Sequence, residues 1–519
     1  MSLLKNFATV GGATATSRVL GFVRDIFIAA ALGTGPIADA FFVAFRFPNL
    51  FRRLFAEGAF NAAFVPLYAK ALEGEGEESA RRFGEEALAA LLTALLIVTA
   101  LAEIAMPLFM FVLAPGFASD PEKFDLAVLL TRIAFPYLAL VSVVAFYSGV
   151  LNARGRFAAA AFAPALLNVV FIVALLFVLW FGYENQPITG IILAWSTLIG
   201  GVAQLGLVIF AATRDGTVFR LRLPKLTAPV KRLWRLAVPG ILAGGIVQIN
   251  IVIGTMIASV ASGAVSYLYF ADRIYQLPLG IVGIAIGIVL LPDLSRRLRS
   301  ERMDLVDHAQ NRSLEFAMAL TLPASMALIV MPEPIINILF ERASFGAADT
   351  QATAKALAAF AFGLPAFVLV KVFSPGFFAR EDTRTPMIFA GVAVAVNVSV
   401  SLLLFPFFAH VGIAIATSLA GWINAALLAG TLHRRGQLNF DDLIRKRLPL
   451  LIFASVMMGA CLFAATWVSA ALLGDPNILV RVAAVGGLVI GGIVFFALFC
   501  QLTGAADFLA ILKRAGKRD

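Results

Sequence analysis

The sequence is poor in the residues that build soluble enzymes and disulfide-bonded domains. Only 14% of its 519 residues are charged, whereas soluble globular proteins have roughly 25%. It holds two cysteines and three scattered histidines, so neither a disulfide framework nor a zinc site nor a catalytic triad can be assembled. Nothing in it resembles a nucleotide-binding loop. We therefore expect no catalytic residue, no metal and no cofactor, and the chain is not expected to be an enzyme.

The chain is instead rich in apolar residues. The chain is 61% hydrophobic, and its mean hydropathy is +0.93. Apolar stretches of about 20 residues recur along it, which is the pattern of membrane-spanning helices. The sequence therefore predicts an all-α polytopic membrane protein with about 14 transmembrane helices. The expected spans are 7–31, 37–70, 83–113, 126–151, 158–182, 187–213, 231–260, 264–296, 307–331, 350–380, 384–408, 411–435, 447–473 and 477–503.

The basic residues are distributed unevenly between alternate connections. The formal net charge is +10, which by itself would also suit a nucleic-acid-binding protein. If the N-terminus starts inside, the inner connections hold most of the 41 Lys and Arg, with seven at 214–235 and five each at 296–312 and 434–447. By the positive-inside rule, this asymmetry places both termini in the cytoplasm and argues against nucleic acid as a partner. The outer connections and outer helix ends hold only Lys123, Arg342, Lys355 and Arg481.

The chain also contains an internal repeat. A shift of 229 residues aligns Pro136 with Pro365 and Asn168 with Asn397. This period spans six expected helices, so the two copies have the same orientation in the membrane, and parallel repeats of this kind hold a substrate site between them. The expected domains are an N-terminal lobe over 1–225, a C-terminal lobe over 226–440, and two further helices with a basic tail over 441–519.

Charged side chains cluster inside the first, second and eighth expected spans, where a bilayer core resists them by several kcal/mol. In the first span Ser17, Arg18, Arg24 and Asp25 fall within an arc of about 120°, which gives this helix one polar face. Lys371 is a further charge in the tenth span. The arginines of the three spans, which outnumber the acids, are Arg18, Arg24, Arg46, Arg52, Arg53 and Arg273. The acids are Asp25, Asp39, Glu57 and Asp272.

Two interpretations of this cluster remain open on the residues alone. An uncompensated cation inside a protein should face water or bind an anion, and the planar guanidinium suits phosphate oxygens. The first interpretation is therefore a cationic, water-filled cavity between the lobes that binds a phosphate-bearing substrate. The second is structural: Arg18 pairs with Asp25 or Asp39, Arg53 pairs with Glu57, and these ion pairs lock the helices together.

Several stretches closely resemble the MurJ/MviN family, the bacterial lipid II flippases of the MOP exporter superfamily. They are "SRVLGFVRD", "ADAFFVAFRFPNLFRRLFAEGAFNAAFVP", "APGF", "YFADRIYQLPLG" and "VKVFSPGFFAREDTRTP". The resemblance implies fourteen helices in two six-helix lobes with two extra C-terminal helices. It also implies the activity, which is moving undecaprenyl-pyrophosphate-linked peptidoglycan precursor from the inner to the outer leaflet by alternating access. A role in peptidoglycan synthesis, cell-wall biogenesis and cell shape, and a place in the bacterial inner membrane, follow from the same resemblance.

The resemblance also assigns roles to individual residues. It implies that lipid II is the substrate, that membrane lipids surround the protein, and that cell-wall synthesis proteins are candidate partners. The residues at the family's substrate-binding positions are Arg18, Arg24, Arg52 and Arg273, with Ser17, Asn49 and Ser266 at matching polar positions. The residues expected to line or gate the cavity or to form ion pairs are Asp25, Asp39, Arg46, Arg53, Glu57, Asp272 and Lys371.

Other functions remain to be distinguished from this one. The chain could export another lipid-linked oligosaccharide, or it could be a non-transporting envelope scaffold or lipid enzyme. A cation-drug antiporter would need acidic cavity residues, which the surplus of arginine argues against. The spans at 231–260, 384–408 and 411–435 contain no Asp or Glu, so a carboxylate-based sodium site is not supported there. We therefore favour the membrane potential as the driving force.

Overall fold

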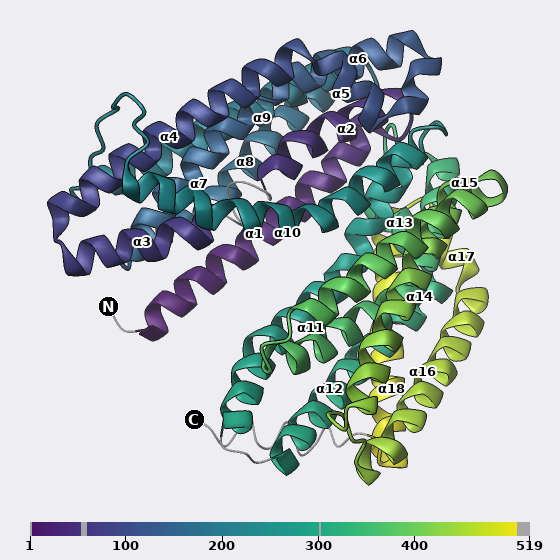
Figure 1. The fold of residues 1–519 in the computed structure, drawn as a ribbon. Coiled ribbons are helices and arrows are strands. Elements are labelled where there is room, and N and C mark those ends of the chain that lie inside the picture. The colour runs from purple at the N-terminus through teal and green to yellow at the C-terminus, as the bar shows by residue number, and fades with distance from the viewer. Residues whose placement is uncertain (1–2, 53–59, 300–302, 506–519) are drawn as a thin grey trace. The chain divides into compact units, whose positions relative to one another are not determined.

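The computed structural model describes residues 3–52, 60–299 and 303–505 (Figure 1). Within these ranges the chain is helical and forms no strand, apart from an isolated β-bridge between Arg342 and Phe345. It divides into two compact units. Unit 1 comprises Met1–Ser266 with Arg342–Gly346, and unit 2 comprises Tyr267–Glu341 with Ala347–Asp519.

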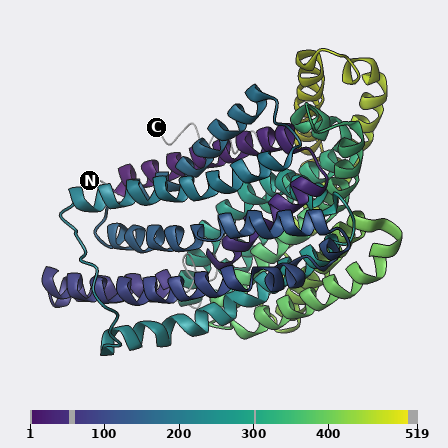
Figure 2. The same ribbon diagram turned by 90° about the horizontal axis from the view of Figure 1, so that it is seen from above.

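The helices of unit 1 run side by side as a bundle (Figure 2). Within it α1 packs against α8, and α2 packs against α6. The elements are α1 (Leu3–Leu32), α2 (Pro36–Phe51), α3 (Asn61–Gly74), α4 (Glu77–Ile104), α5 (Met106–Leu113), the 3₁₀ helix η2 (Pro115–Ser119), α6 (Pro121–Ala134), α7 (Tyr137–Ala153), α8 (Ala158–Phe181), α9 (Pro187–Arg214) and α10 (Ala228–Ala258).

Unit 2 is a second helical bundle, in which α14 packs against α12 and α15. Its first helix, α11, begins at Ala264, so the first residues of this helix still belong to unit 1. The elements are α11 (Ala264–Arg299), α12 (Met303–Val330), α13 (Pro332–Phe340), α14 (Ala347–Phe378), α15 (Arg384–Arg434), α16 (Asp442–Val468), α17 (Ala470–Leu473) and α18 (Ile478–Thr503).

The expected all-helical membrane fold is confirmed. In the described part of the chain, nine helices are long and apolar enough to cross a membrane by length and composition. They lie on the expected spans between 83 and 213 and between 307 and 503, with α6 and α7 together counted as one helix over Pro121–Ala153. The first of them ends at Ile104, short of the expected end at 113. The helix α15 covers two expected spans, and it is broken at Ala409, whose φ of 45° and ψ of −129° are not helical. This break lies between 384–408 and 411–435, where the sequence placed the boundary.

An expected span is interrupted within the described residues. The span 83–113 is divided at Ala105 into α4 and α5, because the backbone there leaves the helical region with φ −90° and ψ 12°. The second span was expected to run continuously over 37–70. The described helices α2, which ends at Phe51, and α3, which begins at Asn61, lie at its two ends. Residues 53–59 lie outside the described part, so the continuity of this span stays a prediction.

The two aligned prolines have different consequences for their helices. Pro136 separates α6 from α7, whereas Pro365 lies inside the continuous helix α14. A proline cannot donate a hydrogen bond to the carbonyl four residues earlier, so Pro365 leaves the Ala361 carbonyl without its helical donor. The Ser325 hydroxyl of α12 donates to that carbonyl at 2.6 Å. A neighbouring helix thus keeps α14 continuous by supplying the missing hydrogen bond.

Small residues allow close packing of α9 in unit 1. A Cβ added at Gly200 would lie 2.4 Å from Leu167 Cδ1 of α8, and one at Gly201 would lie 2.7 Å from Tyr137 Cδ2 of α7. Helices in a membrane associate through such close packing, because lipid tails are as apolar as leucine. These glycines are therefore needed for the contact of α9 with both helices.

An ion-pair clasp joins the end of α7 to the end of α9 in unit 1. Arg154 Nε and Arg156 Nε donate to the two carboxylate oxygens of Asp215 at 2.7 and 2.8 Å. Arg154 also pairs with Glu77 at the start of α4, at 3.0 Å. Burial of Asp215 raises its pKa, but the hydrogen bonds from both arginines outweigh this effect, and the pKa of Asp215 lies below its ordinary value.

Unit 2 has a clasp at the matching turns with the charges exchanged. Asp382, after α14, accepts from Arg435 Nη1, after α15, at 2.7 Å. The turns themselves match: Arg156 N donates to Leu151 O and Asp382 N to Phe377 O, each across five residues. The hydrogen bonds from Arg435 and Thr385 lower the pKa of Asp382 to about 2. The position that is Arg156 in one unit is therefore an aspartate in the other, and the ion pair is kept.

The Asp382–Arg435 clasp predicts a pH-dependent stability. Because the pKa of Asp382 is depressed, its contribution is complete above the ordinary value near 3.8 and is lost as the pH falls towards 2. We expect Asp382→Asn to lower stability by about 1 kcal/mol at pH 7, since Arg435 is partly exposed, and to have little effect near pH 2. Thermal unfolding of the purified protein, with Arg435→Gln and the double variant, measures this. Additive losses in the double variant would contradict a direct pair.

Candidate substrate-binding site

Arg24 is the centre of the polar face of α1. Its side chain is only 8% exposed, and it donates to Asp25 Oδ1 from Nε at 3.1 Å and from Nη2 at 2.8 Å. Asp25 therefore pairs with Arg24, not with Arg18 as the sequence allowed. This carboxylate offsets the charge of the buried guanidinium, which would otherwise be costly in a low dielectric.

A second helix holds the same guanidinium from the other side. Arg24 Nη1 donates to Oδ1 of Asn168 on α8 at 2.9 Å, and Asn168 Nδ2 donates to the Ser17 carbonyl at 3.0 Å. The rings of Phe45 and Phe171 lie 5.7 and 5.6 Å from Arg24 Cζ, within cation–π distance. Arg24 is thus fixed in orientation by contacts with α1, α2 and α8.

Arg18 differs from Arg24 in its surroundings. Its side chain is exposed, and that of Ser17 is half-buried. The two arginines are six residues apart on one helix, or about 9 Å along its axis. The polar face of α1 therefore combines a fixed, compensated guanidinium with an exposed one.

Asp39 near the start of α2 is completely buried, with four hydrogen-bond donors around its carboxylate. Oδ2 accepts from Lys123 Nζ and from Gly263 N, each at 2.8 Å. Oδ1 accepts from Ser266 N at 3.0 Å and from Ser266 Oγ at 2.7 Å. Gly263 and Ser266 flank the start of α11, whose first backbone N–H groups have no partner within the helix. Asp39 therefore caps the N-terminus of α11.

Lys123 at the start of α6 completes this cluster. Its ammonium group lies 4.1 Å from the centroid of the Phe117 ring, and its side chain is 6% exposed. The sequence placed Lys123 in an outer connection and offered Arg18 as a partner for Asp39. The structure shows that the partner is Lys123, so Asp39 and Lys123 form a buried ion pair that joins α2, α6 and the start of α11.

Arg46 of α2 and Arg52, which directly follows α2, also contact polar groups of unit 1. Arg46 Nη1 donates to Thr255 Oγ1 of α10 at 2.6 Å. Arg52 Nε donates to Asn49 Oδ1 at 3.1 Å, and Asn49 Nδ2 donates to the Phe45 carbonyl. Arg53 and Glu57 lie outside the described residues. The proposed Arg53–Glu57 pair therefore stays a prediction.

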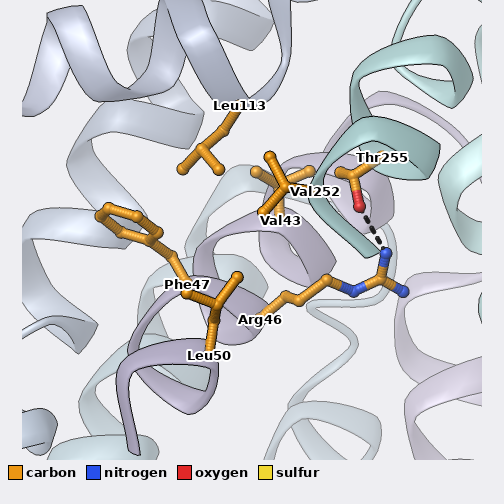
Figure 3. A pocket seen from close by; sticks show the side chains of 7 residues that line it. All are labelled: Val43, Arg46, Phe47, Leu50, Leu113, Val252 and Thr255. Carbon is orange, nitrogen blue, oxygen red and sulfur yellow. Dashed lines mark hydrogen bonds between the residues drawn. The ribbon is translucent and has the colours of Figure 1, made fainter. Parts of the chain in front are cut away.

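Arg46 borders a small apolar pocket (Figure 3). Its guanidinium reaches Thr255 at the rim, while aliphatic and aromatic side chains surround the space. The enclosed volume is about 10 Å³, which is room for roughly one water molecule. This pocket is too small for a lipid headgroup. Its lining residues are Val43, Arg46, Phe47, Leu50, Leu113, Val252 and Thr255.

Unit 2 carries the other expected site residues. Arg273 on α11 donates from Nη2 to the Tyr269 hydroxyl at 3.0 Å, and its Cζ lies 4.8 Å from the centroid of the same ring. Asp272 accepts a hydrogen bond from Gln276 one turn later. The side chains of Asp272 and Arg273 are half-buried, and that of Lys371 on α14 is exposed.

Comparison with known proteins identifies the family. The model of the family "Lipid II flippase MurJ" matches residues 28–497. A "Probable lipid II flippase MurJ" of Rhizobium meliloti (strain 1021) is 50% identical over 521 residues, which is 100% of this chain and 97% of that protein. The chain belongs to the lipid II flippase MurJ family. The resemblance noted in the sequence is thereby confirmed.

Solved structures confirm the fold of this MurJ-family protein. One, described as "Lipid II flippase MurJ, inward closed conformation", has a TM-score of 0.79 at 24% identity and covers 95% of this chain and 98% of that one. An inward-facing multidrug resistance MATE family transporter of the MOP superfamily has a TM-score of 0.67 at 15% identity, with 81% and 95% covered. The fold is therefore that of MOP superfamily transporters.

Some contacts of the polar cluster were not anticipated from the sequence. Asn168 was noted only as a repeat partner of Asn397. In the structure it accepts a hydrogen bond from Arg24 and donates one to the Ser17 carbonyl of α1. Lys123 and Thr255 gave no local signal, because their partners Asp39 and Arg46 are distant in the chain.

We expect Arg24→Ala to abolish function while the protein still inserts into the membrane, because the fixed guanidinium is lost. Arg24→Lys should fail as well, since one ammonium group cannot reach both Asp25 and Asn168 in the same geometry. Asn168→Ala should reduce activity about tenfold through loss of one charge-assisted hydrogen bond. Growth of a strain depleted of the native protein, together with the membrane level of each variant, measures this.

Thr14→Ala is the matched control on α1, because the Thr14 hydroxyl donates only to the Val10 carbonyl of its own helix in the described contacts. It should grow normally. Normal growth with Arg24→Ala would refute a role for this guanidinium in transport.

Lys123→Met should destabilise unit 1 by about 3 kcal/mol, because it leaves the Asp39 carboxylate buried without its cation. Adding Asp39→Asn should recover part of this loss, since the amide is neutral. Thermal unfolding of the three purified variants tests the pair. A double variant that is less stable than Lys123→Met alone would show that the charge of Asp39 serves another group.

Proposed function

We propose that this protein moves lipid II from the inner to the outer leaflet of the bacterial inner membrane by alternating access. The observation that carries the proposal is the match of the MurJ family model to residues 28–497. Arg24, held in a fixed orientation by Asp25 and Asn168, is suited to bind an anionic ligand. The substrate is the undecaprenyl-pyrophosphate-linked peptidoglycan precursor.

The diphosphate is the part of lipid II that the arginines suit. Guanidinium groups bind phosphate oxygens through paired, charge-assisted hydrogen bonds. Asp25 and Asn168 hold Arg24 in place, so little conformational entropy is lost when it binds a ligand. Arg18 lies close enough along α1 for one headgroup to contact both. We assign a substrate-binding role to Arg52 and to Arg273 as well, and Asn49 orients Arg52.

Asp39 and Ser266 have a positioning role in this proposal. Their side chains are bonded to each other, so they hold the start of α11, the helix that also carries Arg273. Asp272, Lys371 and Arg46 shape the polar surroundings of the same route. Both termini lie in the cytoplasm, membrane lipids surround the helices, and cell-wall synthesis proteins receive the flipped precursor.

The decisive experiment is depletion of this protein followed by leaflet-resolved measurement of lipid II. We expect lipid II to accumulate on the inner leaflet, because its synthesis continues while its passage stops. Arg24→Ala should leave this accumulation in place, and Thr14→Ala should relieve it. Accumulation of a different lipid-linked oligosaccharide would identify another cargo. An unchanged leaflet distribution would favour a scaffold or lipid enzyme.

The membrane potential is the proposed driving force. Moving one charge through 100 mV changes the free energy by about 2.3 kcal/mol, so a cationic site that rearranges responds to the potential. Asn397 and Thr417 of α15 are joined by a neutral hydrogen bond of 3.2 Å in unit 2, in a helix that contains no carboxylate. We therefore expect proteoliposome transport to stop when the potential is collapsed with a potassium ionophore and to continue when sodium is replaced. A requirement for a sodium gradient at constant potential would overturn this.

A further inference from the structure

The connection between α9 and α10 carries exposed apolar side chains among basic ones. Its sequence over 218–226 is "VFRLRLPKL". The exposed fractions are 55% for Val218, 78% for Leu221, 84% for Leu223 and 72% for Leu226. A cluster of large apolar side chains facing outward marks a surface that contacts something other than water.

This connection is held in place against α4, so the exposure does not come from a loose loop. The Phe219 ring is buried against Gly84, where an added Cβ would lie 2.4 Å from Phe219 Cε1. Arg220 N donates to Glu85 Oε1 at 3.2 Å, and Arg222 Nε lies 2.5 Å from Glu85 Oε2. Figure 1 shows the connection standing beside α4, with its outer side clear of the other helices of unit 1.

The outward side of the same segment is cationic. Arg220 and Lys225 are exposed in the connection, and Lys231, Arg232 and Arg235 are exposed on the first turns of α10. The opposite face of these turns is buried through Val230, Leu233 and Ala237. We call these exposed residues and the four apolar ones the 218–235 surface.

The nearby acids do not neutralise this surface. Glu85 is completely buried and bound to Arg222, and Glu86 accepts from the Thr227 hydroxyl at 2.7 Å. Asp215 is taken by Arg154 and Arg156. The carboxylates within the segment's own contacts therefore face inward, and the positive charge remains outside.

The place of this connection between α9 and α10 indicates its depth relative to the membrane. It follows directly on α9, which is long and apolar enough to cross a membrane, and it leads into α10. It therefore lies at the height of the lipid headgroups. Leucines beside Lys and Arg at this depth are the composition of an interfacial anchor, in which the apolar chains enter the acyl boundary and the cations meet phosphates.

We propose that the 218–235 surface docks on the anionic phospholipid headgroups of the membrane in which the protein sits. The leucines insert below the headgroups, and the five cations bind lipid phosphates above them. The docked segment ties the ends of α4, α9 and α10 to the leaflet. A soluble acidic protein is the alternative occupant, and its chemistry does not explain leucines at headgroup depth.

The test uses the full chain in nanodiscs of phosphatidylglycerol or phosphatidylcholine. Leu223→Cys carries a spin label in a Cys461→Ser background, since Cys461 is exposed and Cys500 is buried. Power saturation with oxygen and with a water-soluble nickel chelate reports the depth of the label. We expect the label to be immersed in phosphatidylglycerol and largely aqueous in phosphatidylcholine.

Neutral substitutions of single basic residues in the labelled protein test whether the immersion depends on their charge. Each of Lys225→Gln, Arg232→Gln and Arg235→Gln should lower the ratio of immersed to aqueous label about fivefold. A label at Glu78→Cys, at the exposed start of α4, should be aqueous in both lipids. An aqueous Leu223 label in phosphatidylglycerol, equal immersion in both lipids, or immobilisation that requires an added cytosolic protein would each overturn the proposal.

Discussion

A bilayer core offers no water to a charged side chain, so the buried guanidinium of Arg24 and the buried carboxylate of Asp39 depend on contacts within the protein. Arg24 has Asp25 on its own helix and Asn168 across from it. Asp39 has Lys123 and three further donors. These contacts join helices that are distant in the sequence. The same requirement that fixes the polar residues therefore also fixes the packing of α1, α2, α6 and α8.

Because buried charges need partners, the excess of arginines over acids does not by itself identify an unpaired cation. Counting charges treated Arg24 as a candidate for an unpaired cation, but its charge is offset by an adjacent carboxylate, and its value to a ligand lies in its fixed orientation. Asp39 does not neutralise any of these arginines, because it pairs with Lys123. The Arg24–Asp25 ion pair can therefore be structural and still serve ligand binding, because it holds the Arg24 guanidinium in one orientation.

The two units have ion pairs at matching turns and prolines at aligned positions, but the residues and contacts involved differ. Arg156 and Asp215 form the clasp of unit 1, and Asp382 and Arg435 form that of unit 2 with the charges exchanged. An ion pair of either polarity satisfies the same turns, so the geometry is kept while the residues change. The prolines behave likewise: Pro136 ends a helix, and Pro365 is accommodated because Ser325 binds the carbonyl that it leaves open.

The sequence by itself determined the all-helical membrane class, most span boundaries and the polar face of α1. Hydropathy and helical periodicity are local properties, which is why the break at Ala409 fell where two apolar runs meet. Only the tertiary structure decided which charges meet. Lys123 lies 84 residues from Asp39, and Asn168 lies 144 from Arg24, so no pattern along the chain could pair them. Their contacts follow from the packing of whole helices, which depends on shape across the entire bundle.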